Sequence, residues 1–286
     1  MSKMTIKPLG HALGARITGI DLAGRVDDAT MEVIRQARRE HLVLCFPGQD
    51  LSIKEQVAFC SRFGNLEREK NMDGVRHPDF PEIYMLVNKP VEIKAKRIFA
   101  TKADTWHWDG AYFERPAMGT FLLAKELPEI GGDTLFANMY LAYDTLSPTF
   151  KRMIEPLQAV HVRARSRNNL IPGSPEALEI QSTPPCVHSL VGAHPETGRK
   201  SLLLGDRIRN IVGMTEEETR PLVDFLIEHA TRDEYCYRHR WSLHDLVLWD
   251  NLAAQHRGLL DYEAGQPRVM HRCVQLGPRI GHAHAD

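Results

Sequence analysis

Short apolar segments bounded by turn-forming residues fill the second half of the chain, and they constrain the fold more than any other feature. They are MGTFLLAKEL (118–127), HSLVGAH (188–194), KSLLLG (200–205), YCYRHRW (235–241), DLVLWD (245–250) and RVMHRCVQL (268–276). Each has the length and composition of a β-strand. Neither a βαβ rhythm nor a glycine-rich phosphate loop occurs, which disfavours a nucleotide-binding fold. The pattern predicts a β-sandwich or barrel with helices outside it, in one domain spanning 1–286.

Helical spacing is confined to a few other segments. It occurs in DDATMEVIRQARREH (27–41), SIKEQVAFCSRFG (52–64) and TEEETRPLVDFLIEHA (215–230), whereas ARITGIDL (15–22) and HLVLCF (41–46) are typical of strands. Ser52 followed by Glu55, and Thr215 followed by Glu218, predict capping boxes at two helix starts. The sequence therefore predicts a mainly β fold of the α+β type, with flanking helices.

The charge balance limits the kinds of partner. The 286 residues include 36 Lys and Arg against 37 Asp and Glu, a formal net charge of −1. This argues against nucleic acid or an anionic membrane surface as the main partner, and it allows a local basic pocket for a small anion. No signal-peptide pattern, membrane-length apolar window or CxxC pair occurs. We expect a cytoplasmic protein without a disulfide framework.

One H-x-D triplet lies in unusually aromatic surroundings. The chain has four H-x-[DE] triplets, at His77/Asp79, His107/Asp109, His194/Glu196 and His284/Asp286, so the triplet alone has little weight. Only His107 and Asp109 lie among aromatic residues, in ADTWHWDGAYFERP (103–116). In an extended segment their side chains point to the same side, while Trp108 faces away. A divalent metal would stabilise the buried carboxylate, and so would a hydrogen-bonded His–Asp pair in a core.

Further polar candidates lie near the end of the chain. His256 follows a predicted strand and a turn-prone Asp-Asn pair, and it is a candidate third ligand. RVMHRCVQL alternates, so Arg268 and Arg272 share one face, about 13 Å apart at about 3.3 Å per residue. The two arginines fit either an exposed edge strand, with side chains reaching solvent, or a pair of clamps for anionic groups.

Four motifs, in this order, resemble the taurine dioxygenase / 2,4-dichlorophenoxyacetate dioxygenase family of iron(II)- and 2-oxoglutarate-dependent oxygenases. They are WHWD (106–109), GGDTLFANMYLAYDTLSP (131–148), WDNLAAQHRG (249–258) and RVMHR (268–272). PLGHALGARITGIDL (8–22) and HPETGRKSLLL (194–204) are also similar, so the resemblance covers nearly the whole chain. It implies a double-stranded β-helix, or jelly roll, and a hydroxylation coupled to conversion of 2-oxoglutarate and O₂ to succinate and CO₂.

The resemblance assigns roles to individual residues. His107, Asp109 and His256 match the 2-His-1-carboxylate triad that binds catalytic Fe(II), and three such ligands leave coordination positions open for the cosubstrates. Thr134 and Arg268 match the residues that bind the distal carboxylate of 2-oxoglutarate.

Other positions concern the prime substrate. Arg272 matches an arginine that in relatives lies towards an anionic substrate, and Trp108 and Tyr112 are expected in the aromatic wall that excludes water. Glu69 aligns with a substrate-contacting histidine of the taurine-type pattern, and Ala103 aligns with an asparagine. These departures weaken the case for taurine. They favour a different sulfonate, an aryloxyalkanoate or another carboxylate, whose hydroxylated product often fragments.

Two other functions remain as alternatives. A zinc-dependent hydrolase could use the same three ligands, although hydrolysis needs no second clamp for a dicarboxylate. A non-catalytic jelly-roll binding domain is the other alternative, and the intact triad argues against it. Since relatives are commonly dimers or tetramers, the resemblance also implies a homo-oligomer.

Overall fold

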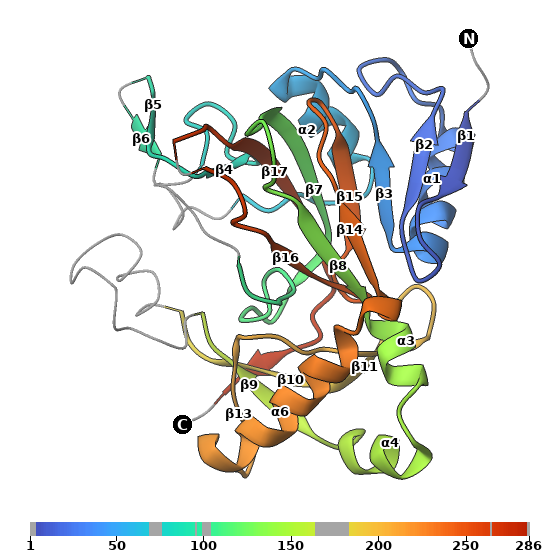
Figure 1. Ribbon diagram of the computed structural model, residues 1–286, viewed down its shortest axis with the longest axis vertical. Coiled ribbons are helices and arrows are strands. Elements are labelled where there is room, and N and C mark those ends of the chain that lie inside the picture. Colours follow the sequence, from blue (N-terminus) through green and yellow to red (C-terminus); the bar gives the residue numbers. More distant parts are fainter. Residues whose placement is uncertain are drawn as a thin grey trace.

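The computed structural model describes residues 4–68, 76–94, 96–98, 104–163, 183–263 and 265–284. Its largest sheet has seven strands in the order β1-β2-β3-β15-β7-β17-β4 (Figure 1). Their bounds are β1 Thr5–Pro8, β2 Ala15–Thr18, β3 Val43–Phe46, β15 Leu246–Asp250, β7 Ala117–Glu126, β17 Val269–Leu276 and β4 Tyr84–Val87. Neighbours pair antiparallel except β2 and β3, which are parallel.

A three-stranded sheet packs against one face of this large sheet. It has the order β14-β8-β16, with bounds Cys236–His239, Thr134–Asn138 and Ala254–Gly258. Leu122, Val247 and Met270 of the large sheet share a buried cluster with Phe136 and Ala254 of the small one. The burial of these apolar side chains between two sheets stabilises the sandwich that carries the site.

Helices α1 (Asp28–His41) and α2 (Ile53–Ser61) pack on the opposite face of the large sheet. Met31 and Phe59 of these helices share a cluster with Phe121 and Leu248, whose neighbours in the chain, Leu122 and Val247, face the small sheet. The central strands are therefore buried on both faces, which explains why they are apolar almost throughout.

Most of the remaining described elements gather at one end of the molecule (Figure 1). They are a four-stranded sheet β13-β9-β10-β18 (Ile208–Ile211, Gln158–His161, Cys186–Ser189, His282–Ala283), the pair β11-β12 (Val191–Ala193, Lys200–Leu202), and helices α3 (Met139–Asp144), α4 (Pro148–Ile154) and α6 (Glu216–Ala230). A short 3-10 helix, η2 (Asp233–Tyr235), follows α6, and the small pair β5-β6 (Val91–Ile93, Lys96–Ile98) lies elsewhere. Within the described ranges, no helix has the length and apolar character needed to cross a membrane.

The structure confirms the mainly β architecture and both capping boxes. The Ser52 side chain accepts from the Glu55 main chain at the start of α2, and the Thr215 side chain accepts from that of Glu218 at the start of α6; both glutamates reach back to the cap. Residues 15–22 form a shorter strand than predicted, because β2 ends at Thr18 and Gly19 has a φ of 76°.

Several elements were absent from the sequence-based expectation. HSLVGAH contributes to two strands, β10 and β11, and the short helices α3 and α4 were not expected. With six and seven residues, these helices are too short to show a helical period. RVMHRCVQL is not an edge strand, since β17 pairs with β7 on one side and β4 on the other.

Candidate active site

Two of the three predicted ligands are joined directly by their main chains. The His107 amide donates to the His256 carbonyl oxygen at 3.1 Å, and the His256 amide donates to that of His107 at 2.9 Å. His256 lies on β16, and the two ring centroids are 4.2 Å apart. This antiparallel bridge fixes both imidazoles at one point of the sandwich, although they are far apart in the sequence.

Asp109 completes the cluster from the same segment as His107. Its Oδ1 lies 3.8 Å from His107 Nε2, and its Oδ2 lies 3.9 Å from His256 Nε2. A ligand atom from each residue lies within 4.8 Å of the other two. The expected i, i+2 convergence of His107 and Asp109 is therefore present, and the third side chain comes from another strand.

The Nε2 atoms of both imidazoles face this point. His107 Nδ1 lies 2.7 Å from the carbonyl oxygen of Thr105, which can only accept, so Nδ1 carries the proton and Nε2 is free to bind a cation. Burial, reinforced by the nearby His107 ring, lowers the pKa of His256 to about 3. His256 is therefore neutral at physiological pH, as a metal ligand must be.

The Asp109 carboxylate is fixed by several polar neighbours. Oδ2 accepts from Thr120 Oγ1 at 2.7 Å, and Oδ1 accepts from Arg272 at 3.1 Å. Asn251 accepts from the Asp109 amide and donates to Thr120, which closes the network. Burial alone would raise the pKa of Asp109, but Arg272, the two histidines and Thr120 outweigh burial and hold that pKa well below its usual range. The group is therefore an anion that lies between the two imidazole rings.

This donor set fits ferrous iron. Two imidazole nitrogens and one carboxylate on one side of a cation form the facial triad of non-haem Fe(II) oxygenases. The free Nε2 of His107 and the ionised carboxylate between the two rings are the observations that make the fit. Fe(II) would be held by His107, Asp109 and His256.

The GGDT motif lies against the first of the two arginines. Gly132 has a φ of 73°, and its carbonyl oxygen accepts from Arg268 Nε at 3.2 Å. A Cβ at Gly132 would lie only 3.1 Å from that Nε, so glycine allows the close approach. Thr134 is buried, and its Oγ1 accepts from Trp241 at 3.0 Å. Burial lowers the pKa of Arg268.

A pocket opens beside Asp109, on the side away from Arg268. Its described lining consists of Glu67, Asp109, Gly110, Tyr112, Phe113, Arg115, Ala117, Arg272, Val274 and Leu276. Arg272, Val274 and Leu276 alternate along β17, so the face predicted to carry the arginines forms one wall. The Arg272 guanidinium also lies over the Tyr84 ring, 4.2 Å from its centroid.

The structure does not bring every predicted substrate residue to this pocket. Tyr112 lines it, but Trp108 is buried on the opposite side, with its ring 5.6 Å from that of His161 and 5.3 Å from that of His188. The alternation that unites His107 and Asp109 turns the residue between them away. Glu69 and Ala103 lie outside the described residues.

Three polar residues at the site were not singled out in the sequence. Thr120 and Asn251 hold Asp109, and Glu67 lines the pocket. Thr120 is the one hydroxyl in the apolar part of MGTFLLAKEL, and a buried hydroxyl usually has a hydrogen-bond partner. Asn251 and Glu67 carried no such signal, because each lies in a loop or turn, where polar residues are ordinary.

Together, the mainly β sandwich and this donor set define a non-haem iron oxygenase. The model of the "Taurine catabolism dioxygenase TauD, TfdA family" matches residues 5–274. The chain belongs to this family. It is an alpha-ketoglutarate-dependent dioxygenase, with Fe(II) as its cofactor and 2-oxoglutarate (alpha-ketoglutarate) and O₂ as its cosubstrates.

Relatives of similar length cover almost the whole chain. This chain is 35% identical over 272 residues to the (S)-phenoxypropionate/alpha-ketoglutarate-dioxygenase of Sphingobium herbicidovorans. The alignment covers 93% of this chain and 92% of that relative. This chain is 32% identical over 290 residues to the alkylsulfatase of Acinetobacter baylyi, with 99% and 88% covered. Among solved structures, AAD-2 in complex with Mn(II) and N-oxalylglycine has a TM-score of 0.77 at 32% identity, with 97% of this chain and 98% of that chain covered.

Proposed function

We propose that this enzyme hydroxylates a small organic anion, namely a sulfonate, an aryloxyalkanoate or another carboxylate, within a jelly-roll core. In this proposal, hydroxylation next to a heteroatom leads to fragmentation of the product, and succinate and CO₂ are released. Relatives named for a phenoxypropionate and for alkyl sulfates support a substrate that combines an anionic group with an apolar body.

The triad residues would hold the metal, and their neighbours would orient them. Bound Fe(II), with 2-oxoglutarate and O₂, supplies the oxidation of a substrate C–H bond and the decarboxylation of the keto acid. Thr120 and Arg272 fix the two carboxylate oxygens of Asp109, and the Thr105 carbonyl fixes the His107 ring. Such partners keep the ligands in one orientation before the metal binds.

Arg268 and Thr134 would bind the distal carboxylate of 2-oxoglutarate. Arg268 is held through Nε by the Gly132 carbonyl, and a guanidinium presents further N–H donors in a planar fork that matches a carboxylate. Trp241 donates to Thr134 Oγ1, which leaves the Thr134 hydroxyl proton available for an acceptor.

Arg272 would bind the anionic group of the prime substrate. It lies on the same strand face as Arg268, four residues nearer the pocket, with Asp109 at 3.1 Å. Tyr112, Phe113 and Val274 give the pocket an apolar wall that would contact the substrate body and exclude water. An anion at Arg272 would place its neighbouring carbon near the triad.

One observation carries this proposal. The three triad side chains converge beside a pocket whose wall carries Arg272, on a strand that begins one residue after Arg268. A hydrolytic site would not need two arginines along one wall.

The test is succinate release from 2-oxoglutarate, measured under O₂ with Fe(II) and a panel of candidate substrates. Each phenoxyalkanoate, alkyl sulfonate and alkyl sulfate is paired with its neutral alcohol or amide analogue. We expect anions to stimulate succinate release at least about 10-fold over their analogues, because a charge-assisted pair is worth about 1.5–3 kcal/mol. Equal stimulation by neutral analogues would contradict the proposal, and so would undiminished discrimination in Arg272→Ala.

A further inference from the structure

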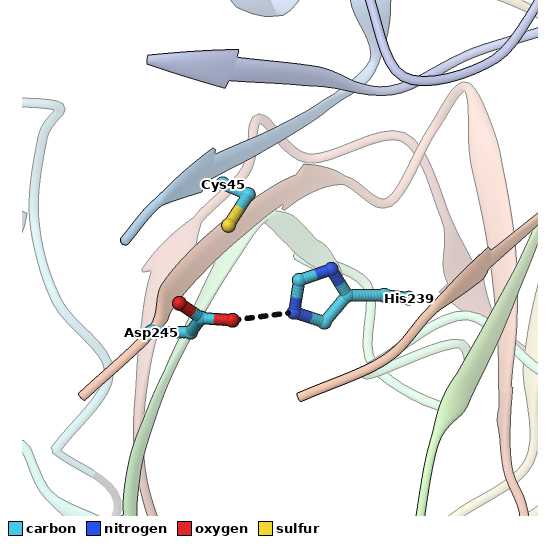
Figure 2. Close-up of side chains that lie close together, drawn as sticks. All are labelled: Cys45, His239 and Asp245. Carbon is cyan, nitrogen blue, oxygen red and sulfur yellow. Dashed lines mark ion pairs between the residues drawn. The ribbon is translucent and has the colours of Figure 1, made fainter. Parts of the chain in front are cut away.

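A second group of metal-ligating side chains lies away from the active site. Cys45 of β3, His239 of β14 and Asp245, just before β15, point towards one another (Figure 2). The Cys45 sulfur, a ring nitrogen of His239 and an Asp245 oxygen all lie within 4.8 Å of one another. The active-site triad satisfies the same distance condition.

These distances suit a metal after small side-chain rotations. His239 Nε2 is 3.3 Å from Asp245 Oδ2, close to the separation of two ligands on one ion. When three atoms all lie within 4.8 Å of one another, a central point exists that is at most about 2.8 Å from each of them. Bonds from zinc are shorter, about 2.3 Å to sulfur and about 2.0 Å to nitrogen. On binding, the site would contract by at most about 0.5 Å at the sulfur and about 0.8 Å at the nitrogen.

Burial and charge favour a cation at this point. The exposed fractions of Cys45, His239 and Asp245 are 1%, 2% and 3%. Within the described part of the chain, the basic side chain within ion-pair distance of Asp245 is His239, which carries a charge only when protonated. Arg16, whose charge acts on Cys45, is solvent-exposed. A buried carboxylate needs a partner of opposite charge. The complex of a divalent ion with one thiolate, one carboxylate and one neutral imidazole has no net charge.

Neighbouring side chains already orient the ligands. Tyr237 Oη lies 3.0 Å from His239 Nδ1, and the Trp241 ring packs edge-on against the imidazole with centroids 4.6 Å apart. Asp245 Oδ2 accepts from the Ser242 amide at 3.0 Å. An outer hydrogen bond to one imidazole nitrogen, with the other facing the cluster, is the usual arrangement around a metal-bound histidine.

We propose that Cys45, His239 and Asp245 form a second, closed metal site that takes a thiophilic divalent ion of the Zn²⁺ class. Thiolate and imidazole ligands select zinc, whereas the sulfur-free active site suits Fe(II). Binding forms an Sγ–metal bond and releases the Cys45 proton to solvent, with no change of oxidation state. Since the ligands are buried, the ion enters as the chain folds and stabilises the contact between β3 and β14.

The full-length chain, unfolded and refolded anaerobically with Co²⁺ alone, tests the proposal. Cys45 bound to Co²⁺ would give a near-ultraviolet thiolate-to-metal charge-transfer band, which the sulfur-free active site lacks. We expect this band in the wild-type chain and in Asp109→Ala, with two equivalents of bound metal in the wild-type chain and one in Asp109→Ala. Cys45→Ser would lose the band and one equivalent of metal. Cys60→Ser, which changes another fully buried thiol, would keep both.

A persistent band in Cys45→Ser, or a wild-type chain with no band, would overturn the proposal. If Cys45→Ser does not refold, X-ray absorption of the zinc-loaded wild-type chain decides the question. We expect a sulfur neighbour at about 2.3 Å. A spectrum with only nitrogen and oxygen neighbours would refute the site.

Discussion

The two three-ligand clusters of this protein differ in access and in ligand chemistry. His107, Asp109 and His256 combine two nitrogens with oxygen. Asp109 lines a pocket, and 12% of the His107 side chain is exposed. The cluster of Cys45, His239 and Asp245 contains sulfur and is closed on all sides. A catalytic metal site needs a position that substrate or water can reach, and a fully buried cluster does not offer one. One β-sandwich can therefore offer both kinds of site. The two sites differ in whether solvent and substrate can reach them, not in the number of protein ligands.

The two carboxylates also differ in their surroundings. Asp109 has a guanidinium and a hydroxyl as partners, so its charge is compensated before any metal binds. Asp245 has a main-chain amide and an imidazole. A metal is therefore expected to contribute more to folding at the closed cluster and more to chemistry at the open one.

The largest effect should come from Asp109→Ala. Loss of the single carboxylate ligand should reduce 2-oxoglutarate-dependent succinate formation to background, because the remaining two imidazoles do not form a facial triad. Succinate is measured with Fe(II) and the best substrate from the panel. Turnover near the wild-type rate would contradict the assignment of the open cluster as the catalytic one.

The two arginines of β17 should separate cosubstrate from substrate. Arg268→Ala should weaken 2-oxoglutarate binding about 10- to 100-fold, because it removes charge-assisted hydrogen bonds. Arg272→Ala should raise the KM for the prime substrate and, because Arg272 also pairs with Asp109, weaken Fe(II) binding, so both variants are compared at saturating Fe(II). The check is the anaerobic titration of Fe(II)-loaded protein with 2-oxoglutarate, followed by its charge-transfer absorption. Equal loss of 2-oxoglutarate affinity in both variants would remove the distinction.

Thr120 acts through Asp109 and should have a smaller effect. Thr120→Val keeps the shape of the side chain but removes the hydrogen bond to Oδ2, and such losses weaken metal binding about 10-fold or more. Thr120→Ser should retain most of the affinity because it keeps the hydroxyl. Fe(II) affinity measured by competition with a chelator distinguishes the two. If both variants bind equally, Thr120 is not a positioning residue.

Tyr237→Phe should produce the smallest change, and only at the closed cluster. Removing one neutral hydrogen bond to His239 costs about 1 kcal/mol, so metal affinity there should fall about 5-fold. The Co²⁺ charge-transfer band should persist at saturating metal. Succinate formation with the best substrate should stay unchanged, and a large loss of turnover would link the two clusters.

The sequence predicted most of what local chemistry specifies. Capping boxes at Ser52 and Thr215 depend on residues three apart, and the convergence of His107 and Asp109 depends on residues two apart. Such short-range rules act before any tertiary contact forms. His256 was a candidate third ligand from its place after a predicted strand, but its motif became informative only in combination with the others.

The contacts missed by the sequence depend on the pairing of distant strands. Cys45 looked like an ordinary strand cysteine, and it meets His239 only because β3 and β14 belong to sheets that face each other. Asn251 lies in a turn far from Asp109 in the sequence and accepts a hydrogen bond from the Asp109 amide. No local pattern encodes such partners, whose positions are fixed by sheet order and register.

Because a main-chain bridge brings His107 and His256 together, the protein binds iron at this site only when its chain is completely folded. The two histidines meet only after the long intervening chain has closed and its strands have paired, so no fragment that lacks either histidine carries the complete triad. A ligand that binds the native state alone stabilises it by about 2.7 kcal/mol at one hundred times its dissociation constant. The lifetime of this enzyme in the cell should therefore depend on the supply of iron. Iron starvation should lower the amount of the protein as well as its activity.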